Sequence, residues 1–284
     1  MRVYEDPEYK WSGMLLGVVT GFAILTRPPL LLFVPIIIFF YWQKKTYHSL
    51  IICLLSFIVV LLPWTLRNYA LYHQVIFTTL IGEYNLWIGN TLASDGGQIA
   101  GGSNPVTTFV AGHGIYGLHK AASAAVRAFV VEHPGAFIKL CFTRFIRFFS
   151  LIRPMGFWFY QYGLSQAIFV ASSMGWIALA FVTGFAGMLA ALVREKKEIL
   201  RYLAAFAITA PLPLLLTVVQ SRYRFQIYPF LAVFAAYFIV ETKNKRLSWR
   251  NGLFVFPTVG FIIITLIDTA QSFSLIIERL LVWV

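Results

Sequence analysis

The chain has 284 residues, of which 59% are hydrophobic and only 12% are charged, and its mean hydropathy is +0.76. This composition excludes an ordinary soluble domain, because several apolar runs reach the roughly 20 residues that a helix needs to cross a bilayer. The formal net charge of +12 would suggest a nucleic-acid partner for a soluble protein, but in a membrane protein it is interpreted loop by loop. We therefore expect an integral membrane protein with no nucleic-acid partner.

Residues 1–66 form a first region with three predicted spans. Apolar runs at 13–26 and 30–42 are separated by Thr26-Arg27-Pro28-Pro29. Adjacent prolines disfavour a continuous helix, so we expect two short spans that meet at Arg27. A third span covers 48–64 and is closed by Pro63-Trp64, with Trp64 at the membrane interface.

Residues 67–164 form a second region, a large outer loop with amphipathic helices. Residues 63–97 are predicted to make the floor of a binding site, with 82–97 as a polar loop, and glycines, serines and an asparagine at 94–104 mark a turn-rich segment. Apolar residues at helical spacing in 118–129 predict an amphipathic helix that ends at 133–135. Residues 136–153 carry four dispersed basic side chains, each costing ~2.5–3.5 kcal/mol near mid-bilayer. We place them in the interface.

Residues 165–284 form a third region whose apolar runs predict four more spans, at 165–192, 200–219, 226–240 and 252–272. If 136–153 does not cross, the N-terminus and short inner loops hold 12 Lys and Arg, against three in the short outer loops. The positive-inside rule favours this orientation. We expect an all-α polytopic protein of the cell membrane with about seven transmembrane helices, its N-terminus inside and its active face non-cytoplasmic.

Four arginines fall on the outer face in this topology: Arg27, Arg67, Arg222 and Arg224. Each lies beside an apolar run and hence near the headgroup level. Guanidinium groups bind phosphate through charge-assisted, often bidentate hydrogen bonds. We predict that these arginines bind a lipid phosphate, and the alternative is that each one extends to the phospholipid headgroups.

The outer segment also contains residue types that suit a sugar. Carboxylates and amides bind sugar hydroxyls, and aromatic rings pack against a sugar or a prenyl chain, although these residues also form turns and interface anchors. The predicted sugar or loop contacts are Glu83, Tyr84, Asn85, Trp87, Asn90 and Asp95. We assign no catalytic residue and no cofactor, and the histidine spacings do not make a metal site. Asp268 is an isolated acid in the last span, near its outer end.

The order of several short motifs resembles a known family. The motifs are Leu25-Thr26-Arg27-Pro28, Leu62 to Tyr69, Asn85 to Asn90, Gly96-Gly97, and Arg222 to Phe225 before Pro229. Their order is similar to that in polytopic glycosyltransferases of the dolichyl-phosphate-mannose protein mannosyltransferase and aminoarabinose transferase type. The resemblance implies a C-type glycosyltransferase fold, a polyprenyl-phosphate-linked sugar donor, a glycan, lipid or protein acceptor, and chemistry on the non-cytoplasmic face.

One departure from the family concerns the catalytic acid. In such enzymes it lies in the first outer loop, upstream of the Thr-Arg-Pro motif, and this chain begins just before that motif. We expect a C-terminal portion of a longer protein; the alternatives are a missing N-terminal half on another polypeptide, or a relative without catalysis. The predicted function is thus a membrane glycosyltransferase or its C-terminal portion. The alternative is a non-catalytic lipid-binding or scaffolding subunit, and a transporter is a third class.

Overall fold

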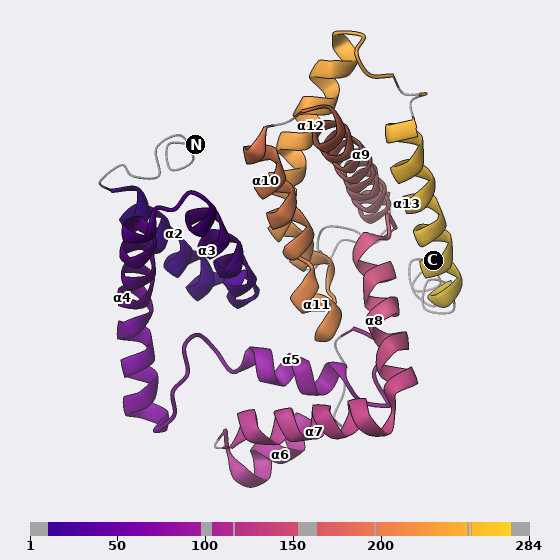
Figure 1. Ribbon diagram of the computed structural model, residues 1–284. Coiled ribbons are helices and arrows are strands. Elements are labelled where there is room, and N and C mark those ends of the chain that lie inside the picture. The colour runs from indigo at the N-terminus through magenta and orange to yellow at the C-terminus, as the bar shows by residue number, and fades with distance from the viewer. Residues whose placement is uncertain are drawn as a thin grey trace. The chain divides into compact units, whose positions relative to one another are not determined.

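The computed structural model describes residues 11–97, 104–115, 117–152, 164–195, 197–248, 250 and 252–273. Every regular element within these ranges is a helix (Figure 1). The chain divides into two compact units, and each is described by itself. Unit 1 contains Met1–Ala93 and Ile99–Pro134, and unit 2 contains Ser94–Gln98 and Gly135–Val284. These units divide the chain differently from the three sequence regions, because the short segment 94–98 belongs with the C-terminal helices.

Unit 1 begins with four apolar helices and continues with three shorter or more polar ones. The elements are α2 (Ser12–Thr26), η1 (Pro28–Leu32), α3 (Phe33–Gln43), α4 (Tyr47–Tyr72), α5 (Ile81–Gly89), α6 (Pro105–His113) and α7 (Leu118–Glu132). The helix break predicted at Arg27 is confirmed, since α2 ends at Thr26 and the two prolines start the 3-10 helix η1. The amphipathic helix at 118–129 is confirmed as α7, which buries Leu118, Ala122 and Phe129.

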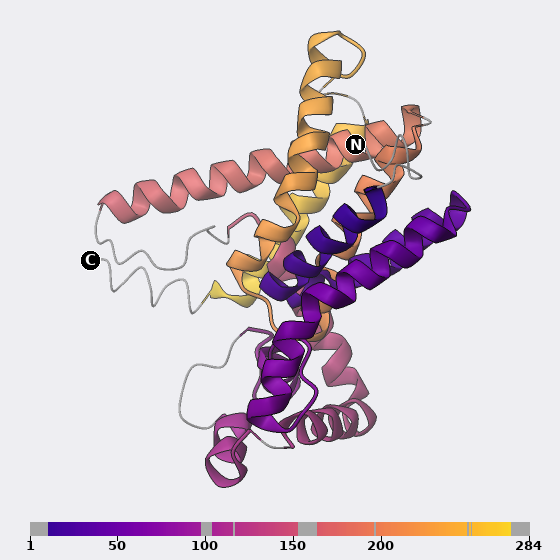
Figure 2. The ribbon, with the colours of Figure 1, turned by 90° about the vertical axis from the view of Figure 1, so that its left-hand side faces the viewer.

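Three glycines one helical turn apart allow α2 to lie against α4 (Figures 1 and 2). A Cβ atom added to Gly13 would clash with the carbonyl oxygen of Ser49, and one added to Gly17 would clash with that of Cys53. Small residues at this spacing let two helix backbones approach closely in membrane proteins. The contacts advance together along both helices, so α2 and α4 run parallel.

Two expectations for unit 1 were wrong. The third span does not end at Pro63, because α4 continues through this proline to Tyr72. Proline removes a single helical N–H donor, and the helix beyond it is held by Trp64 and Asn68, whose side chains donate to backbone carbonyls at Thr78 and Ile76.

The second correction concerns residues 82–90, which are not a polar loop. Residues 81–89 form helix α5. Its apolar residues recur at helical spacing, so that Ile88 is fully buried and the Trp87 ring lies 5.6 Å from the Phe109 ring of α6. The tertiary contacts with α6 and α7 therefore outweigh the weak helical tendency of the polar and glycine residues in this stretch.

Unit 2 is built around three long helices, α9, α12 and α13, which lie side by side (Figure 1). The elements are α8 (Pro134–Phe149), α9 (Leu164–Arg194), α10 (Glu198–Thr209), α11 (Leu212–Leu216), η2 (Ser221–Gln226), α12 (Tyr228–Lys243) and α13 (Gly252–Gln271). Its core is aromatic: Phe149 of α8 lies within 6.2 Å, centroid to centroid, of Phe181, Phe185 and Phe261. These rings join α8 to α9 and α13.

Several helices present apolar side chains outward. On α4, Ile51, Leu55, Ile58 and Leu62 are all exposed, a pattern that lipid satisfies and water does not. Among the described residues, four helices are long and apolar enough to cross a membrane: Tyr47–Tyr72, Ile168–Arg194, Glu198–Leu216 and Gly252–Gln271. The apolar helices Ser12–Thr26 and Pro28–Gln43 are shorter. This architecture is consistent with the helical membrane protein that the composition predicts.

Candidate functional site

An apolar groove of about 860 Å³ lies in unit 1. Its lining comes from the C-terminal end of α2, from η1 and α4, and from the non-helical segment 74–80. The apolar wall residues include Ile24, Leu31, Phe57, Ile58, Leu61 and Leu62. Because Leu31, Ile58 and Leu62 are also exposed at the surface, the groove opens on the apolar face of the unit.

Two polar side chains of α4 hold the segment 74–80 that lines the groove. The Trp64 Nε1–H donates to the Thr78 carbonyl at 2.6 Å, and the Asn68 amide donates to the Ile76 carbonyl at 2.9 Å. Asn68 is buried. Residues Trp64 and Asn68 of the predicted motif therefore shape the groove.

The polar end of the groove contains an acidic and a basic residue type side by side. Glu83 of α5 and His119 and Lys120 of α7 line it. The His119 Nδ1 lies 3.1 Å from the Glu83 Oε1. An ionised carboxylate only accepts hydrogen bonds, so Nδ1 donates in this pair and Nε2 faces away from Glu83. His119 is the more exposed partner.

Arg27 and Arg67 lie at the same end of the parallel helices α2 and α4. Gly13 lies beside Ser49 and Gly21 beside Val60, which gives offsets of 49 minus 13, or 36, and 60 minus 21, or 39. Extending this register places Arg27 level with positions 63–66 of α4, close to Arg67. Both arginines are exposed, and their neighbours Pro28 and Thr65 line the groove.

Arg67 also interacts with its own helix. Its Nη1 donates to the Asn68 side-chain oxygen at 3.3 Å, and its guanidinium carbon lies 5.0 Å from the Trp64 ring centroid. A cation over the face of an indole is held by the ring quadrupole. Arg67 is thereby anchored next to the wall that Trp64 and Asn68 organise.

The other predicted contact residues of α5 have mainly structural partners. The Tyr84 hydroxyl accepts from the Asn104 amide at 2.6 Å, and Trp87 packs on Phe109. Asn90 is buried and donates to the Leu86 carbonyl at 2.7 Å. Asn85 is half-buried. Glu83 is thus the member of this helix that lines the groove.

Unit 2 contains an arginine cluster, defined by the buried Arg144 of α8 and Arg224 of η2 and the largely buried Arg147 of α8. Arg144 is fully buried and donates through Nη1 to the Leu215 carbonyl at 3.0 Å. Burial lowers the pKa of Arg144 to about 10; Cys141 opposes this shift, and the like charge of Arg147 adds to it. Arginine remains charged at neutral pH at this value, so α8 carries buried positive charge.

Arg224 holds the C-terminal end of α8. It is 1% exposed, and its Nη2 donates to the carbonyls of Arg147 at 2.8 Å and Ser150 at 2.7 Å. A cation suits the last carbonyls of a helix, which lack helical partners and carry partial negative charge. Arg222 is half-buried, and its guanidinium carbon lies 5.4 Å from the Tyr223 ring.

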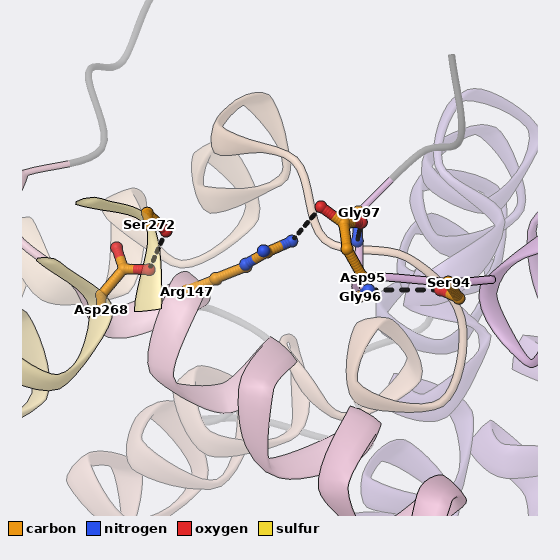
Figure 3. Close-up of polar contacts among 7 residues, drawn as sticks. All are labelled: Ser94, Asp95, Gly96, Gly97, Arg147, Asp268 and Ser272. Carbon is orange, nitrogen blue, oxygen red and sulfur yellow. Dashed lines mark hydrogen bonds and ion pairs between the residues drawn. The ribbon is translucent and has the colours of Figure 1, made fainter. Parts of the chain in front are cut away.

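The segment Ser94–Gly97, which we call the strap, contacts Arg147 of this cluster through Asp95 (Figure 3). Asp95 Oδ2 lies 3.1 Å from Arg147 Nη1, and Asp95 Oδ1 accepts from the Gly97 N–H at 2.8 Å. Burial would raise the pKa of Asp95, but the Gly97 hydrogen bond and the Arg147 charge outweigh it, so the pKa lies below its ordinary value. The Val219 N–H donates to the Gly96 carbonyl.

The two glycines of the strap have separate physical roles. Gly96 has φ +92°, a conformation that glycine adopts without steric cost. A Cβ atom at Gly97 would lie 3.3 Å from Arg147 Nη1, so the absence of a side chain permits the close approach of the guanidinium group. The turn predicted at Asp95-Gly96-Gly97 is thus explained, whereas residues 98–103 of the predicted loop lie outside the described residues.

Asp268 is fully buried on α13. The Ser272 hydroxyl, one turn later, lies 3.4 Å from its Oδ1 (Figure 3). Asp268 thus does not face bulk water, contrary to the expectation from its position near the end of the span.

A second apolar groove, of about 390 Å³, lies in unit 2. Its walls come from α8, α9, α10, α11 and α13, and include Phe145, Phe149, Leu215 and Phe261. Leu215 is also the residue whose carbonyl Arg144 binds. The buried positive charge of α8 and this apolar groove therefore share a wall.

The predicted site residues divide between the units. Arg27, Arg67 and Glu83 belong to unit 1, and Arg222, Arg224 and Asp95 to unit 2. The sequence analysis did not select His119, Lys120, Arg144 or Arg147. The spacing of Arg144 and Arg147, one turn apart on an amphipathic helix, is a signal of a shared face.

Within the described residues, no group of three or more His, Cys, Asp or Glu side chains is arranged to hold a metal ion. Comparisons with protein-family models, with curated proteins and with solved structures find no match for this chain. A functional assignment therefore depends on its own residues and their geometry.

Proposed function

We propose that this chain is a membrane glycosyltransferase, or the C-terminal portion of one, that binds a polyprenyl-phosphate-linked sugar on the non-cytoplasmic face of the cell membrane. The single observation that supports this proposal most is the unit 1 groove. Its walls are largely apolar, it opens on an apolar surface, and Arg27 and Arg67 lie beside the lining residues Pro28 and Thr65. A prenyl chain fits the walls, and a phosphate fits the arginines.

The proposed reaction is attack by an acceptor hydroxyl on the anomeric carbon of the sugar. The acceptor oxygen forms the new bond to carbon, the bond between that carbon and the phosphate oxygen breaks, and the lipid phosphate leaves with the electron pair. Arg27 and Arg67 would stabilise the charge that develops on the phosphate. The acceptor hydroxyl loses its proton to a base as the new bond forms.

We also propose that the chain crosses the membrane seven times, as the hydropathy predicts. The seven spans are the four long apolar helices, the two shorter ones at Ser12–Thr26 and Pro28–Gln43, and α12. In this topology α8 lies in the interface, and its basic residues stay at headgroup depth. The C-type glycosyltransferase fold and the outer position of the groove belong to the same proposal.

The first test of the proposed function measures lipid binding by the purified chain in detergent, with farnesyl phosphate as the probe. Arg67→Ala should weaken binding by about 10- to 100-fold, since a hydrogen bond to a charged group contributes about 1.5–3 kcal/mol. The matched control is Arg127→Ala, because Arg127 is an exposed arginine of the same unit whose Nε donates to its own helix at Ser123. Equal binding by both variants would reject the phosphate assignment.

A second pair of variants tests the groove itself. Leu62→Trp places an indole in the groove from an exposed position, and should reduce the affinity for farnesyl phosphate. Leu66→Trp is the control, because Leu66 is exposed on the same helix and does not line the groove. Sugar transfer is then assayed with and without membrane extract, which supplies any N-terminal module.

A non-catalytic lipid-binding or scaffolding subunit is the second candidate. One observation favours it: among the described residues that line the unit 1 groove, Glu83 is the sole carboxylate, and His119 already holds it. This candidate predicts that farnesyl phosphate binds with the same dependence on Arg67, whereas no sugar is transferred under any complementation.

A further inference from the structure

Arg147 forms an ion pair with Asp95 in which Arg147 is the more buried partner. The Arg147 side chain is 11% exposed, whereas that of Asp95 is 59% exposed. Exposed ion pairs contribute little net stability, because water competes for both partners. The strap carboxylate is therefore accessible to competing solutes, on a guanidinium group that is itself largely removed from water.

Two donors converge where the Asp95 carboxylate lies. Arg147 Nη1 and the Gly97 N–H each hold one of its oxygens, as Figure 3 shows. The Arg147 Nε is also buried, and it has no hydrogen-bond partner among the described residues. A side chain and a backbone amide that together hold a carboxylate provide the donors that an external oxyanion requires.

The surroundings of this pair are positively charged. Arg144 is fully buried one turn earlier on α8, and Arg224 donates to the carbonyl of Arg147 itself. Both guanidinium groups remain charged at neutral pH. A phosphate group carries up to two negative charges and three acceptor oxygens, so it gains more from this field than the singly charged carboxylate of Asp95 does.

We propose that unit 2 contains a second anion site, in which a phosphate monoester binds Arg147 and the Gly97 N–H in place of the Asp95 carboxylate. Asp95 is then an intramolecular competitor that occupies the site when no phosphate is present. This site goes beyond the proposed function, because it lies in unit 2 and does not involve the unit 1 groove. Its ligand is either a free phosphate or a lipid phosphate, and the test separates the two.

The test measures the binding of inorganic phosphate to the purified chain by calorimetry at constant ionic strength. Asp95→Ala removes the competitor and should tighten the Kd by about tenfold or more relative to the wild type. Glu132→Ala is the matched control, since Glu132 is an exposed acid of unit 1 and its loss changes the net charge by the same amount. The control should leave the Kd within about twofold.

The proposal also predicts that the tighter phosphate binding of Asp95→Ala depends on Arg147. Asp95→Ala combined with Arg147→Gln should lose phosphate binding, and Asp95→Ala combined with Arg147→Lys should retain weakened binding, because lysine keeps the charge but lacks the guanidinium fork. The lysine variant also shows whether loss in the glutamine variant reflects the site or a failure to fold. Size-exclusion chromatography and thermal melting monitor folding in each variant.

Farnesyl phosphate and inorganic phosphate are titrated in parallel into Asp95→Ala combined with Arg67→Ala and Leu62→Trp, so that the unit 1 groove does not contribute to the binding. A Kd tighter than that of inorganic phosphate identifies a lipid phosphate as the ligand, and an equal Kd identifies a soluble one. The proposal is overturned if Asp95→Ala does not tighten phosphate binding, if Glu132→Ala tightens it equally, or if binding persists without Arg147. If the proposed function is wrong, Arg67→Ala and Leu62→Trp will instead leave the affinity for farnesyl phosphate unchanged.

Discussion

Arg224 shows how a residue chosen as a ligand also holds the fold together. Its guanidinium group ties η2 to the end of α8 through the carbonyls of Arg147 and Ser150, and its carbon lies 5.5 Å from the Phe181 ring. Removing one partner from a buried hydrogen-bonded set leaves the other partners without solvation. We therefore expect Arg224 to affect stability more than its neighbour Arg222.

Arg224→Met tests this role. The substitution keeps an apolar chain of moderate length but leaves two helix-end carbonyls without their donor, so it should lower the free energy of unfolding by about 2–3 kcal/mol. Arg222→Met, at a half-buried arginine two positions earlier, should cost less than about 1 kcal/mol. The thermal midpoint in detergent, read by circular dichroism, gives the comparison. Equal losses would show that the α8 carbonyls do not depend on Arg224.

The Asp95–Arg147 pair makes a pH-dependent contribution with a defined sign. The pKa of Asp95 in the folded protein lies below its ordinary value of 3.8, so the carboxylate stabilises the fold above pH 3.8, and this contribution is lost as the pH falls through the lower, folded pKa. The difference in thermal midpoint between the wild type and Asp95→Asn should thus be constant near neutral pH and shrink below pH 3.8. A difference that grows on acidification would contradict the assignment.

At the scale of elements, glycines decide how closely helices pack. On α9, a Cβ atom at Gly187 would clash with the carbonyl oxygen of Phe234 on α12, and one at Gly184 would lie 2.8 Å from the Leu231 Cβ. Gly175, on the same helix, has open space around it. The contact between α9 and α12 therefore requires glycine at two positions and not at the third.

Gly187→Ala and Gly175→Ala form a matched pair within one helix. Alanine is favoured over glycine in a helix interior by about 0.5–1 kcal/mol, so Gly175→Ala should raise the thermal midpoint slightly. Gly187→Ala forces α12 away and should lower the free energy of unfolding by about 1–3 kcal/mol. Thermal melting curves of the two variants show whether each substitution raises or lowers the thermal midpoint. A neutral Gly187→Ala would mean that α9 and α12 separate without cost.

Local chemistry predicted some elements and missed others for identifiable reasons. Consecutive prolines gave a correct break after Thr26, and apolar spacing gave a correct α7, because both signals act within a few residues. The end of α4 was wrong because Pro63 is outweighed by bonds from Trp64 and Asn68 to a segment about ten residues further on. Helix α5 was missed because it depends on contact with Phe109.

At the scale of the whole molecule, the site could be predicted only in part. The groove-forming roles of Trp64 and Glu83, and the shared level of Arg27 and Arg67, follow motifs that were recognised. The pairing of Asp95 with Arg147 and of Glu83 with His119 joins residues more than 30 positions apart. The order of charges along a sequence does not show which distant residues meet in the fold. The arginine cluster of unit 2 was therefore recognised only from the structure.

The proposed topology has a direct test across the whole chain. In a background of Cys53→Ala and Cys141→Ser, single cysteines at Lys45 and Lys197 should react with a membrane-impermeant maleimide only after the cytoplasmic side is exposed. Cysteines at Thr79 and His113 should react in intact cells. If the Lys45 and Lys197 positions label from opposite sides, α8 or another segment crosses the membrane and the seven-span arrangement is wrong.

The strap also sets an order in time. Gly96 accepts its hydrogen bond from Val219, and 219 minus 96 is 123 residues. At about 5–20 residues per second of synthesis, the strap waits about 6–25 s for this partner to emerge. The neighbouring helices α5 and α7 fold from contacts available sooner. A nascent chain halted before Val219 should therefore leave Asp95-Gly96-Gly97 open to protease, and a completed chain should protect it.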